Sequence, residues 1–359
     1  MSLKITGKRP TGRIRERIQK SSIYRNGSFQ NQSPTPMKRD DISYWKMTRE
    51  FMRKHPGTAP GNPIPSIKTD LNKLDNDEPV VVWFGHSSYF IRINSKNFLI
   101  DPVFSGNAAP VSFMVKAFPG ADAYKAEDMP AIDYLILTHD HYDHLDFKTI
   151  RKLQGKTGRI ICSLGISAHL EYWGVPGQKI TELEWWQAVS LDNDMEMIAA
   201  PARHFSGRGV KRGQTLWSSY ILKTPTHRLY LGGDSGYDVH FKEIGDKYGP
   251  FDLAILECGQ YNTMWPLIHM MPEQTVQAAI DLQAKALMPV HWAKFKLGLH
   301  PWNEPVRRLI AEMERLKRED PTIQNSSDTL PAVVTPKIGE PVIINGGYCS
   351  TPWWEGLDS

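Results

Sequence analysis

Residues 139–144 place three histidines and two aspartates in six consecutive positions. They follow an apolar run, residues 132–137, which predicts a buried β-strand that ends in this polar loop. Neutral imidazole nitrogens and a carboxylate oxygen at one strand tip are the ligands that zinc-like divalent ions prefer. A lone histidine in a loop would be an ordinary solvated side chain, but the spacing of the whole set favours a metal site.

Three later apolar runs are also followed by a side chain that can bind a metal ion. Residues 195–200 lead to His204, residues 228–231 to Asp234 and residues 286–290 to His291. Taken alone, either histidine would more often be structural. Together with the first loop, they supply five histidines and two aspartates, enough for two ions and an exogenous ligand. The predicted metal ligands are His139, His141, Asp143, His144, His204, Asp234 and His291.

The elements that must position these residues begin with three short strands separated by turn residues, which is typical of an antiparallel opening. These strands are predicted at residues 80–84, 88–93 and 97–100. Strands and single helices then alternate, which predicts two sheets packed face to face with helices outside. The further strands are predicted at residues 159–162, 216–223, 251–257, 332–334 and 342–344, and the helices at 147–153, 239–248, 272–283 and 304–317.

Residues 1–76 differ from the rest of the chain, because they are rich in Arg, Lys, Ser, Asn and Pro and show little periodicity. We expect them to form an extended arm that packs on a main domain of residues 77–359. Residues 41–52 have apolar side chains near helical spacing and predict a short helix that lies on the main domain.

Composition sets further limits on structure and partners. The three cysteines, Cys162, Cys258 and Cys349, are odd in number and far apart, so we expect buried free thiols. The net charge is +4, with much of the excess in the first 54 residues, which suits an anionic membrane surface, an anionic substrate or a solvated basic arm. No apolar run reaches the roughly 20 residues that cross a bilayer. We therefore expect a location in the cytoplasm or at a membrane surface. A leader peptide that preceded this sequence and was removed stays an open alternative.

The order and spacing of the predicted ligands, with Asp234 in Gly-Gly-Asp-Ser-Gly, resemble the metallo-β-lactamase superfamily over residues 79–345. The resemblance implies an α+β fold, a four-layer αββα sandwich. Within the superfamily, the chain is similar to the branch that contains N-acyl phosphatidylethanolamine phospholipase D and the ascorbate-6-phosphate lactonases. The similar stretches are residues 83–88, 99–105, 138–146, 201–205 and, more weakly, residues 24–31 of the arm.

The resemblance also implies a division of the ligands between two ions. One ion would be held by His139, His141 and His204, the other by Asp143, His144 and His291, with Asp234 as a bridge. Two ions roughly 3.5–4 Å apart can share a hydroxide of lowered pKa, which is a nucleophile suited to phosphodiester hydrolysis. The resemblance implies two Zn²⁺ ions, although the same ligands accept Mn²⁺ or Fe²⁺. A di-iron redox role is disfavoured, because flavodiiron relatives have Glu at the position of His141.

Four residues beyond the ligand set are expected either behind the ligands or near the substrate. Asp101 would orient a ligand histidine, or else cap the turn before a proline. His86 would hydrogen-bond inside the site. His269 follows an aromatic loop, and the resemblance implies that it contacts substrate, where it could act as a general acid; the alternative is a helix-capping or packing role. Trp265 lies in that methionine-rich loop, which could receive an acyl chain or pack into the core. The predicted catalytic residues are Asp143, Asp234 and His269.

Three functions follow as alternatives. The first is a phosphodiesterase of phospholipase D type that acts on N-acyl phosphatidylethanolamine-like lipids. The second is a lactonase or sugar-phosphate hydrolase, which predicts a narrow polar cleft with the 261–271 loop packed inward. The third is a non-catalytic metal-binding scaffold, against which the complete ligand set argues. We expect a lipid or small-molecule substrate, peripheral membrane contact and a homo-oligomer as partners, and no nucleic acid, because the catalytic part lacks a long basic stripe.

Overall fold

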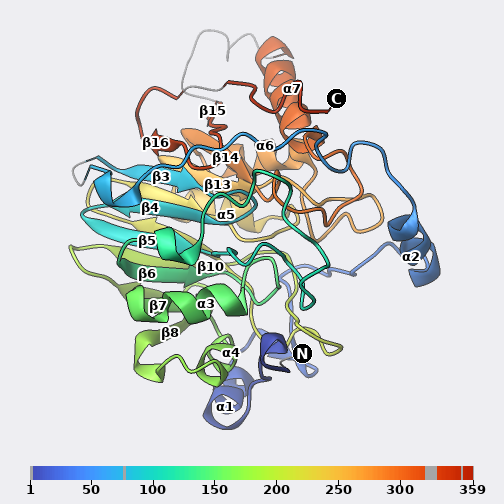
Figure 1. Ribbon diagram of the computed structural model, residues 1–359. Helices are drawn as coiled ribbons and strands as arrows, with labels where there is room; N and C mark the ends of the chain where they lie inside the picture. Colours follow the sequence, from blue (N-terminus) through green and yellow to red (C-terminus); the bar gives the residue numbers. More distant parts are fainter. Residues whose placement is uncertain (1–2, 76–77, 320–329, 349–350, 359) are drawn as a thin grey trace.

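The computed structural model describes residues 3–75, 78–319, 330–348 and 351–358. In this part of the chain, two seven-stranded sheets lie face to face between groups of helices (Figure 1). The first sheet has the order β16-β3-β4-β5-β6-β7-β8. Its strands are β3 (Val80–Trp83), β4 (Tyr89–Ile93), β5 (Lys96–Ile100), β6 (Ile132–Leu137), β7 (Thr157–Ser163), β8 (Ile180–Leu183) and β16 (Pro341–Ile343).

The second sheet has the order β15-β14-β13-β12-β11-β10-β9. Its strands are β9 (Ala188–Ser190), β10 (Glu196–Ala200), β11 (Ser219–Lys223), β12 (Arg228–Leu231), β13 (Leu253–Glu257), β14 (Ala286–Val290) and β15 (Ala332–Val333). The strands β3, β4 and β5 pair antiparallel, as predicted, whereas β5 to β8 and β12 to β15 are parallel runs. Parallel strands end at one edge of their sheet, so the loops that follow them are brought together.

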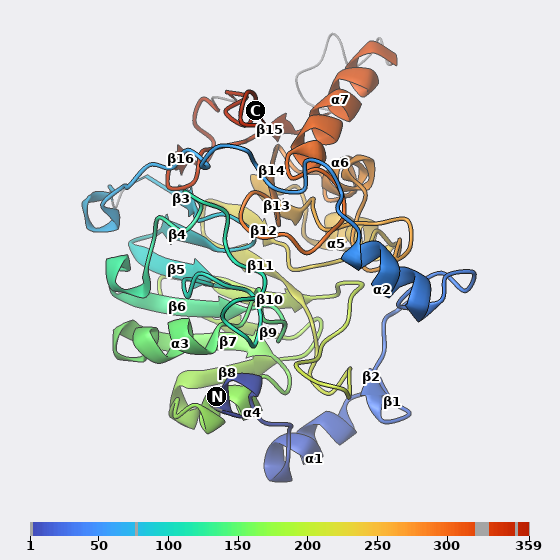
Figure 2. The same ribbon diagram turned by 45° about the vertical axis from the view of Figure 1, so that its right-hand side comes forward.

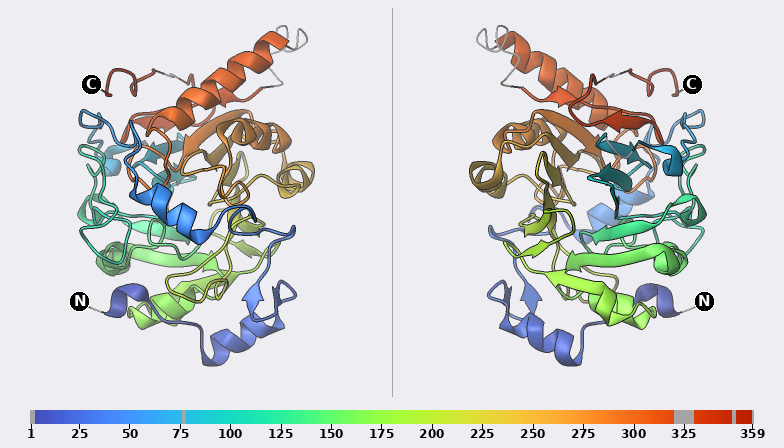
Figure 3. Two further views of the ribbon diagram at one scale, coloured as in Figure 1. Left: turned by 90° about the vertical axis from the view of Figure 1, so that its right-hand side faces the viewer. Right: turned by 90° about the vertical axis from the view of Figure 1, so that its left-hand side faces the viewer.

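The core between the sheets is built from side chains that alternate along the strands, such as Val81, Ile91, Met197 and Leu229. The outer face of the first sheet is covered by α3 (Phe147–Leu153) and α4 (Ser167–Tyr172). The outer face of the second sheet is covered by α5 (His240–Tyr248), α6 (Pro272–Asp281) and α7 (Glu304–Glu319). The two helical groups lie on opposite sides of the sheets (Figures 2 and 3). The predicted αββα sandwich is confirmed.

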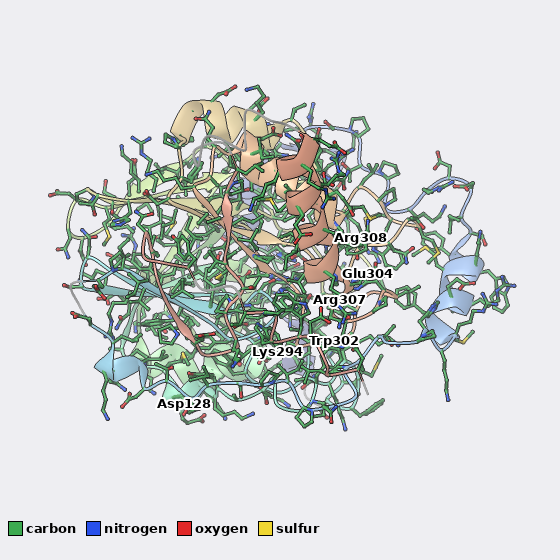
Figure 4. The ribbon with its side chains drawn as sticks, turned by 90° about the horizontal axis from the view of Figure 1, so that it is seen from above. Asp128, Lys294, Trp302, Glu304, Arg307 and Arg308 are labelled. Carbon is green, nitrogen blue, oxygen red and sulfur yellow. The ribbon has the colours of Figure 1, made fainter. Side chains whose placement is uncertain are left out.

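Local chemistry explains where these helices begin and how they dock. The side chain of Asp146 caps α3 by accepting a hydrogen bond from the Lys148 amide at 3.0 Å. Helix α7 docks on α6 through Arg308, whose Nη2 lies 2.7 Å from a carboxylate oxygen of Glu273. Figure 4 shows Arg308 and Glu304 on α7, seen from above. Because these ion pairs are partly exposed, packing of the apolar face of α7 contributes more to docking than charge does.

The N-terminal arm is more structured than its composition predicts. It contains α1 (Gly12–Lys20), a hairpin of β1 (Tyr24–Arg25) and β2 (Ser28–Phe29), and α2 (Tyr44–Met52). The predicted helix at residues 41–52 corresponds to α2, but α1 and the hairpin were not predicted. Ile18 of α1 and Phe29 of β2 pack against Leu164 and Trp217 of the main body, and these long-range contacts are invisible to local patterns. The expected boundary at residues 76 and 77 lies outside the described residues.

Other predictions at this level differ in detail. The elements α4, β8 and β9 were not predicted, because each is too short to show a clear apolar period. The strand predicted from Leu216 begins at Ser219, since the Leu216 amide instead donates to the carbonyl of Leu164 at 2.8 Å. Cys162 and Cys258 are buried free thiols, and Cys349 lies outside the described residues. Within the described ranges, no helix combines the length and apolar character needed to span a bilayer.

Candidate metal centre and its pocket

The loops after β6, β10, β12 and β14 bring the seven predicted ligands together in two neighbouring groups. In each group, one candidate ligand atom per residue lies within 4.8 Å of the others. The first group is His139, His141, His204 and Asp234, and the second is His86, Asp143, His144 and His291. This division matches the expected one, except that His86 joins the second group.

Asp234 lies between the two groups. Its Oδ1 is 3.2 Å from His144 Nε2 and 3.2 Å from His291 Nδ1. Its Oδ2 is 3.7 Å from His139 Nε2 and 3.7 Å from His204 Nε2. One carboxylate thus faces both groups with different oxygens, which is the geometry that a bridging ligand requires.

The first group has the chemistry of a cation site. His141 Nδ1 lies 3.0 Å from His139 Nε2 and 3.2 Å from His204 Nε2, so three ring nitrogens converge. Burial lowers the pKa of all three histidines, which keeps the rings neutral and their nitrogens available as donors to an ion. Neutral rings cannot satisfy all of these close nitrogen pairs by hydrogen bonds alone, whereas one bound ion would satisfy the three together.

The second group contains buried atoms that lack partners. Among the described residues, His86 Nδ1 and His144 Nε2 of this group make no hydrogen bond, and neither does Asp234 Oδ1 beside it. Burial raises the pKa of Asp143 and Asp234, but the neighbouring imidazoles, His144 above all, outweigh burial, so the pKa of both carboxyls is lowered and both are ionised. Burial lowers the pKa of His144, yet the same two carboxylates raise it above its ordinary value. A bound cation would take the place of that proton, so this group also fits an ion.

Hydrogen bonds behind the candidate ligands fix which nitrogen each ring presents. His144 donates from Nδ1 to Asp101 Oδ2 at 2.8 Å, and the Thr138 amide donates to Asp101 Oδ1 at 2.9 Å. His204 Nδ1 donates to the carbonyl of Ile268 at 2.8 Å. In both rings this leaves Nε2 for the centre. Of the two roles expected for Asp101, the structure therefore favours orientation of a histidine.

The backbone at the centre is strained at several residues that carry the site. His86, Asp101 and His291 have positive φ values of 54°, 40° and 69°. Such conformations of non-glycine residues cost on the order of 1–3 kcal/mol each and persist where the surroundings hold them. Two backbone hydrogen bonds join the loops of His86 and His291. The His291 amide donates to the carbonyl of His86 at 2.9 Å, and the His86 amide donates to the carbonyl of Trp292 at 2.9 Å. His86 Nε2 in turn contacts Asp143 Oδ2 at 2.9 Å.

Two amide side chains that sequence reasoning missed hold these loops in place. Asn31 of the arm donates to the carbonyl of His204 at 2.8 Å and accepts from its amide at 3.1 Å. Gln260 donates to the carbonyl of His291 at 3.1 Å and accepts from the Leu297 amide at 2.9 Å. The available signal for Asn31 was its place at the end of residues 24–31, the stretch that resembles the phospholipase. No local pattern marks Gln260.

A third missed contact ties the loop of residues 139–144 to the start of the chain. Asp140 accepts from the Gly207 amide at 2.6 Å and contacts His169 Nε2 at 3.2 Å. Arg208 donates from Nη1 to the carbonyl of Asp140 and from Nη2 to the carbonyl of Ile5, each at 2.8 Å. The metal loop is therefore held on the side away from the pocket by a buried cation that also binds the arm.

His269 lies beside the centre, in a group with Asp234 and His291. Its Nδ1 is 3.6 Å from Glu257 Oε2, which directs Nε2 away from that carboxyl. Burial raises the pKa of Glu257 to about 7, whereas Glu257 raises the pKa of His269 against the effect of burial. His269 also lines the pocket described next, so it has the position expected of a residue that contacts substrate.

A pocket of about 340 Å³ opens above the two groups. Its floor contains His141, Asp143, His204, Asp234 and His291, and most of its wall is apolar. The apolar part of the wall comes from the arm and from the loops after β10, β13 and β14: Met37, Tyr44, Met47, Phe51, Phe205, Trp265, Ile268 and Leu297. Trp265 is almost completely buried and also lines the pocket. Its loop therefore packs into the core, and the expectation that it receives an acyl chain stays a prediction.

Comparisons with known proteins agree with this geometry. Residues 96–292 match the family model of the beta-lactamase superfamily domain. An uncharacterized protein of Mycobacterium tuberculosis is 38% identical over 95% of this chain and 89% of its own length. An N-acyl-phosphatidylethanolamine-hydrolyzing phospholipase D of Caenorhabditis elegans is 30% identical over 60% of this chain and 64% of its own. A metallo hydrolase of the archaeon Ignicoccus hospitalis superposes with a TM-score of 0.55 at 20% identity, over 76% of this chain and all of its own. The chain belongs to the beta-lactamase superfamily.

Proposed function

We propose that this metal-dependent hydrolase of the metallo-β-lactamase superfamily is a phosphodiesterase of phospholipase D type that acts on N-acyl phosphatidylethanolamine-like lipids. The observation that carries the proposal is a single pocket in which the two His/Asp groups form the floor, apolar side chains form most of the wall and two cations, Lys38 and Arg212, stand beside them. The similarity to the Caenorhabditis elegans protein, whose name gives this activity, supports the choice of substrate.

The chain would hold two divalent ions, which we propose to be zinc, with His139, His141 and His204 around one, Asp143, His144 and His291 around the other, and Asp234 between them. When bound, such ions supply an activated water and polarise a phosphoryl oxygen. The protein's part is to fix the ligands through Asp101, Asn31 and the carbonyl of Ile268, and to keep the floor of the pocket buried.

Lys38 and Arg212 are suited to bind a phosphate. Among the described residues, neither forms an ion pair, so neither charge is neutralised by a carboxylate. Arg212 lies over the ring of Phe205 with its guanidinium carbon 5.0 Å from the ring centroid, and Lys38 lies 5.4 Å from the centroid of Tyr44. These rings hold the two cations at the wall of the pocket, where they would bind the anionic diester and neutralise charge in the transition state.

His269 would donate a proton to the leaving oxygen of the diester. Its Nδ1 faces Glu257, so the ring is oriented from behind and Nε2 is left for the pocket. Glu257 is itself fixed, because its Oε1 accepts from the Met270 amide at 2.6 Å. We propose His269 as the general acid and Glu257 as its positioning residue.

The alternative of a lactonase or sugar-phosphate hydrolase predicts a narrow polar cleft with the 261–271 loop packed inward. The loop does pack inward, since Met264, Trp265 and Ile268 are buried. The pocket wall that this loop helps to form is nevertheless apolar rather than polar, which favours a lipid acyl chain over a sugar or a small polar lactone.

Turnover of three substrates by the zinc-loaded protein tests the proposal: an N-acyl phosphatidylethanolamine, a simple phosphodiester and a small lactone. We expect metal-dependent release of phosphatidic acid from the lipid, which a chelator abolishes. Arg212→Gln should lower kcat/KM for the phosphodiester about tenfold, whereas Lys211→Gln, a neighbouring exposed cation outside the pocket, should leave it unchanged. Metal-dependent turnover of the lactone alone, or of none of the three, would contradict the proposal.

A further inference from the structure

Helix α2 differs from the other long helices of the described chain because none of its residues is buried. It stands at the periphery of the molecule, on the right-hand side of Figures 1 and 2. Trp45 is 72% exposed, Met52 69% and Tyr44 67%. A cluster of large apolar side chains on one exposed helix is costly in water and is typical of a surface that contacts a membrane or another protein.

The helix has two apolar faces with different neighbours. Tyr44, Met47 and Phe51 line the pocket above the metal centre, and the ring of Phe51 stacks on that of Trp265 at 5.5 Å between centroids and 6° between planes. Trp45 and Met52 are about two helical turns apart, so they share a second face, and neither lines the pocket. The apolar surface therefore continues from the wall of the pocket, over the helix, to solvent.

Basic side chains flank this surface. Lys46, Arg49, Arg53 and Lys54 are exposed on or just after α2, and the carboxylate among them is Glu50. Glu50 lies 3.0 Å from Arg53 Nη1 and 3.9 Å from Arg49 Nη2, so it compensates part of this charge. Arg39, ahead of the helix, is already paired with Asp41 at 2.8 Å. The helix thus carries a net positive charge beside its exposed aromatic rings.

We propose that α2 is a membrane-docking helix that lies in the headgroup layer of an anionic phospholipid surface and places the mouth of the pocket against the lipid. Tryptophan, tyrosine and basic residues beside aliphatic side chains are the combination that amphipathic helices use at that depth. The charge complementarity favours a lipid surface over a protein partner, and the continuity of the apolar surface with the pocket gives an acyl chain a route to the site. The inference rests on the proposed lipid substrate.

Co-sedimentation of the full chain with vesicles tests the inference without any turnover. The vesicles would be phosphatidylcholine alone or phosphatidylcholine with phosphatidylglycerol. We expect binding to the anionic vesicles, weakened by added salt, and at least about tenfold weaker binding of the double variant Trp45→Ala, Met52→Ala. Tyr172→Ala is the matched control, because Tyr172 is an exposed aromatic residue at the end of α4, away from α2. It should bind as the original protein does.

Two further measurements separate this inference from the proposed function. The double variant should keep its kcat/KM on a soluble phosphodiester and its thermal unfolding midpoint, since neither side chain lines the pocket or is buried. If the protein binds vesicles but cleaves no lipid, the proposed function fails and the docking helix stands. Absence of binding to the anionic vesicles, or equal binding by the double variant and the control, would overturn the inference.

Discussion

The metal centre and helix α2 face the same pocket but are held in opposite ways. At the centre, every ligand ring except that of His141 is buried, and the second nitrogens of His144 and His204 are hydrogen-bonded. The backbone there is strained into positive φ at His86, Asp101 and His291. Helix α2 buries no residue and contacts the main body through few side chains, of which Phe51 on Trp265 is the clearest. In the function that we propose, the rigid floor activates water, and the loosely held wall selects and delivers the substrate. Changes at the floor should therefore abolish activity, and changes at the wall should alter its dependence on substrate.

The largest effect is expected at Asp234, because one carboxylate serves both groups. Asp234→Asn removes the negative charge and replaces one of the two carboxylate oxygens by an NH2 group, so one of the two groups loses its oxygen donor. We expect kcat/KM to fall by about a thousandfold or more with loss of bound metal. Asp194→Asn, at an exposed turn, is the control and should change neither quantity. Elemental analysis together with kinetics on a simple phosphodiester measures both. Full metal content and near-normal turnover in Asp234→Asn would contradict the claim that changes at the pocket floor abolish activity.

A large effect on stability is expected from Lys294, a buried cation near the floor. Its ammonium donates to the carbonyls of Phe84 at 3.1 Å and Val103 at 3.0 Å, and burial lowers its pKa from 10.5 to about 8. The unfolded chain therefore binds the proton more tightly between pH 8 and about 10.5, so the free energy of unfolding should gain up to about 3 kcal/mol from this group as pH rises through that window.

Chemical denaturation at a series of pH values checks this expectation. Lys294→Met should lose the gain between pH 8 and 10.5, whatever its absolute stability. A variant with the same pH profile as the original protein would show that Lys294 is not buried as a cation, and would weaken the account of a tightly constrained floor.

The arm should contribute to metal affinity through Asn31, even though this residue is not a ligand. Asn31→Ala removes the two hydrogen bonds that hold the backbone of His204, and metal affinity should fall roughly ten- to a hundredfold. Competition with a chromogenic chelator measures the affinity. Gln32→Ala, an exposed amide of the same segment, is the control. Equal metal affinities in the two variants would show that the arm contributes to the pocket wall but not to metal binding.

The smallest effect is expected at Phe51. Its ring is about half exposed, so Phe51→Ala should lower the free energy of unfolding by no more than about 1 kcal/mol. The same change opens the apolar wall of the pocket, and KM for an N-acyl phosphatidylethanolamine should rise several-fold while kcat is retained. Steady-state kinetics on the lipid and on a soluble phosphodiester separate the effect on KM from the effect on kcat. A fall in kcat for both substrates would mean that the pocket wall also positions the residues of the floor.

The predictability of the two regions from sequence follows the same contrast. The residues gathered at the floor could be predicted, because donors such as His204 and His291 each follow a strong apolar strand, and parallel strands end at one edge. The layers of the sandwich followed from the same strands and from the period of α7. The hydrogen bonds of Asn31, Gln260 and Arg208 could not be predicted, since each joins residues far apart in the chain, and only Asn31 lay in a stretch that the sequence singled out. The hairpin of β1 and β2 and helix α1 were missed for the same reason, because they are ordered by packing on Leu164 and Trp217.

The exposure of individual apolar residues on α2 could not be predicted from the sequence either. Its spacing predicted a helix but could not indicate which apolar residues would be covered. Met47 packs toward the buried loop around Trp265, whereas Trp45 and Met52 do not. Only the structure separates the residues that belong to the pocket from those that face solvent.

The metal content of the purified protein tests the central claim most directly. Protein prepared without chelators should carry close to two transition-metal ions per chain by elemental analysis, as two groups of ligands that share Asp234 require. Fewer than one ion per chain, after the protein has also been offered zinc, would contradict the account and leave a non-catalytic scaffold as the better description.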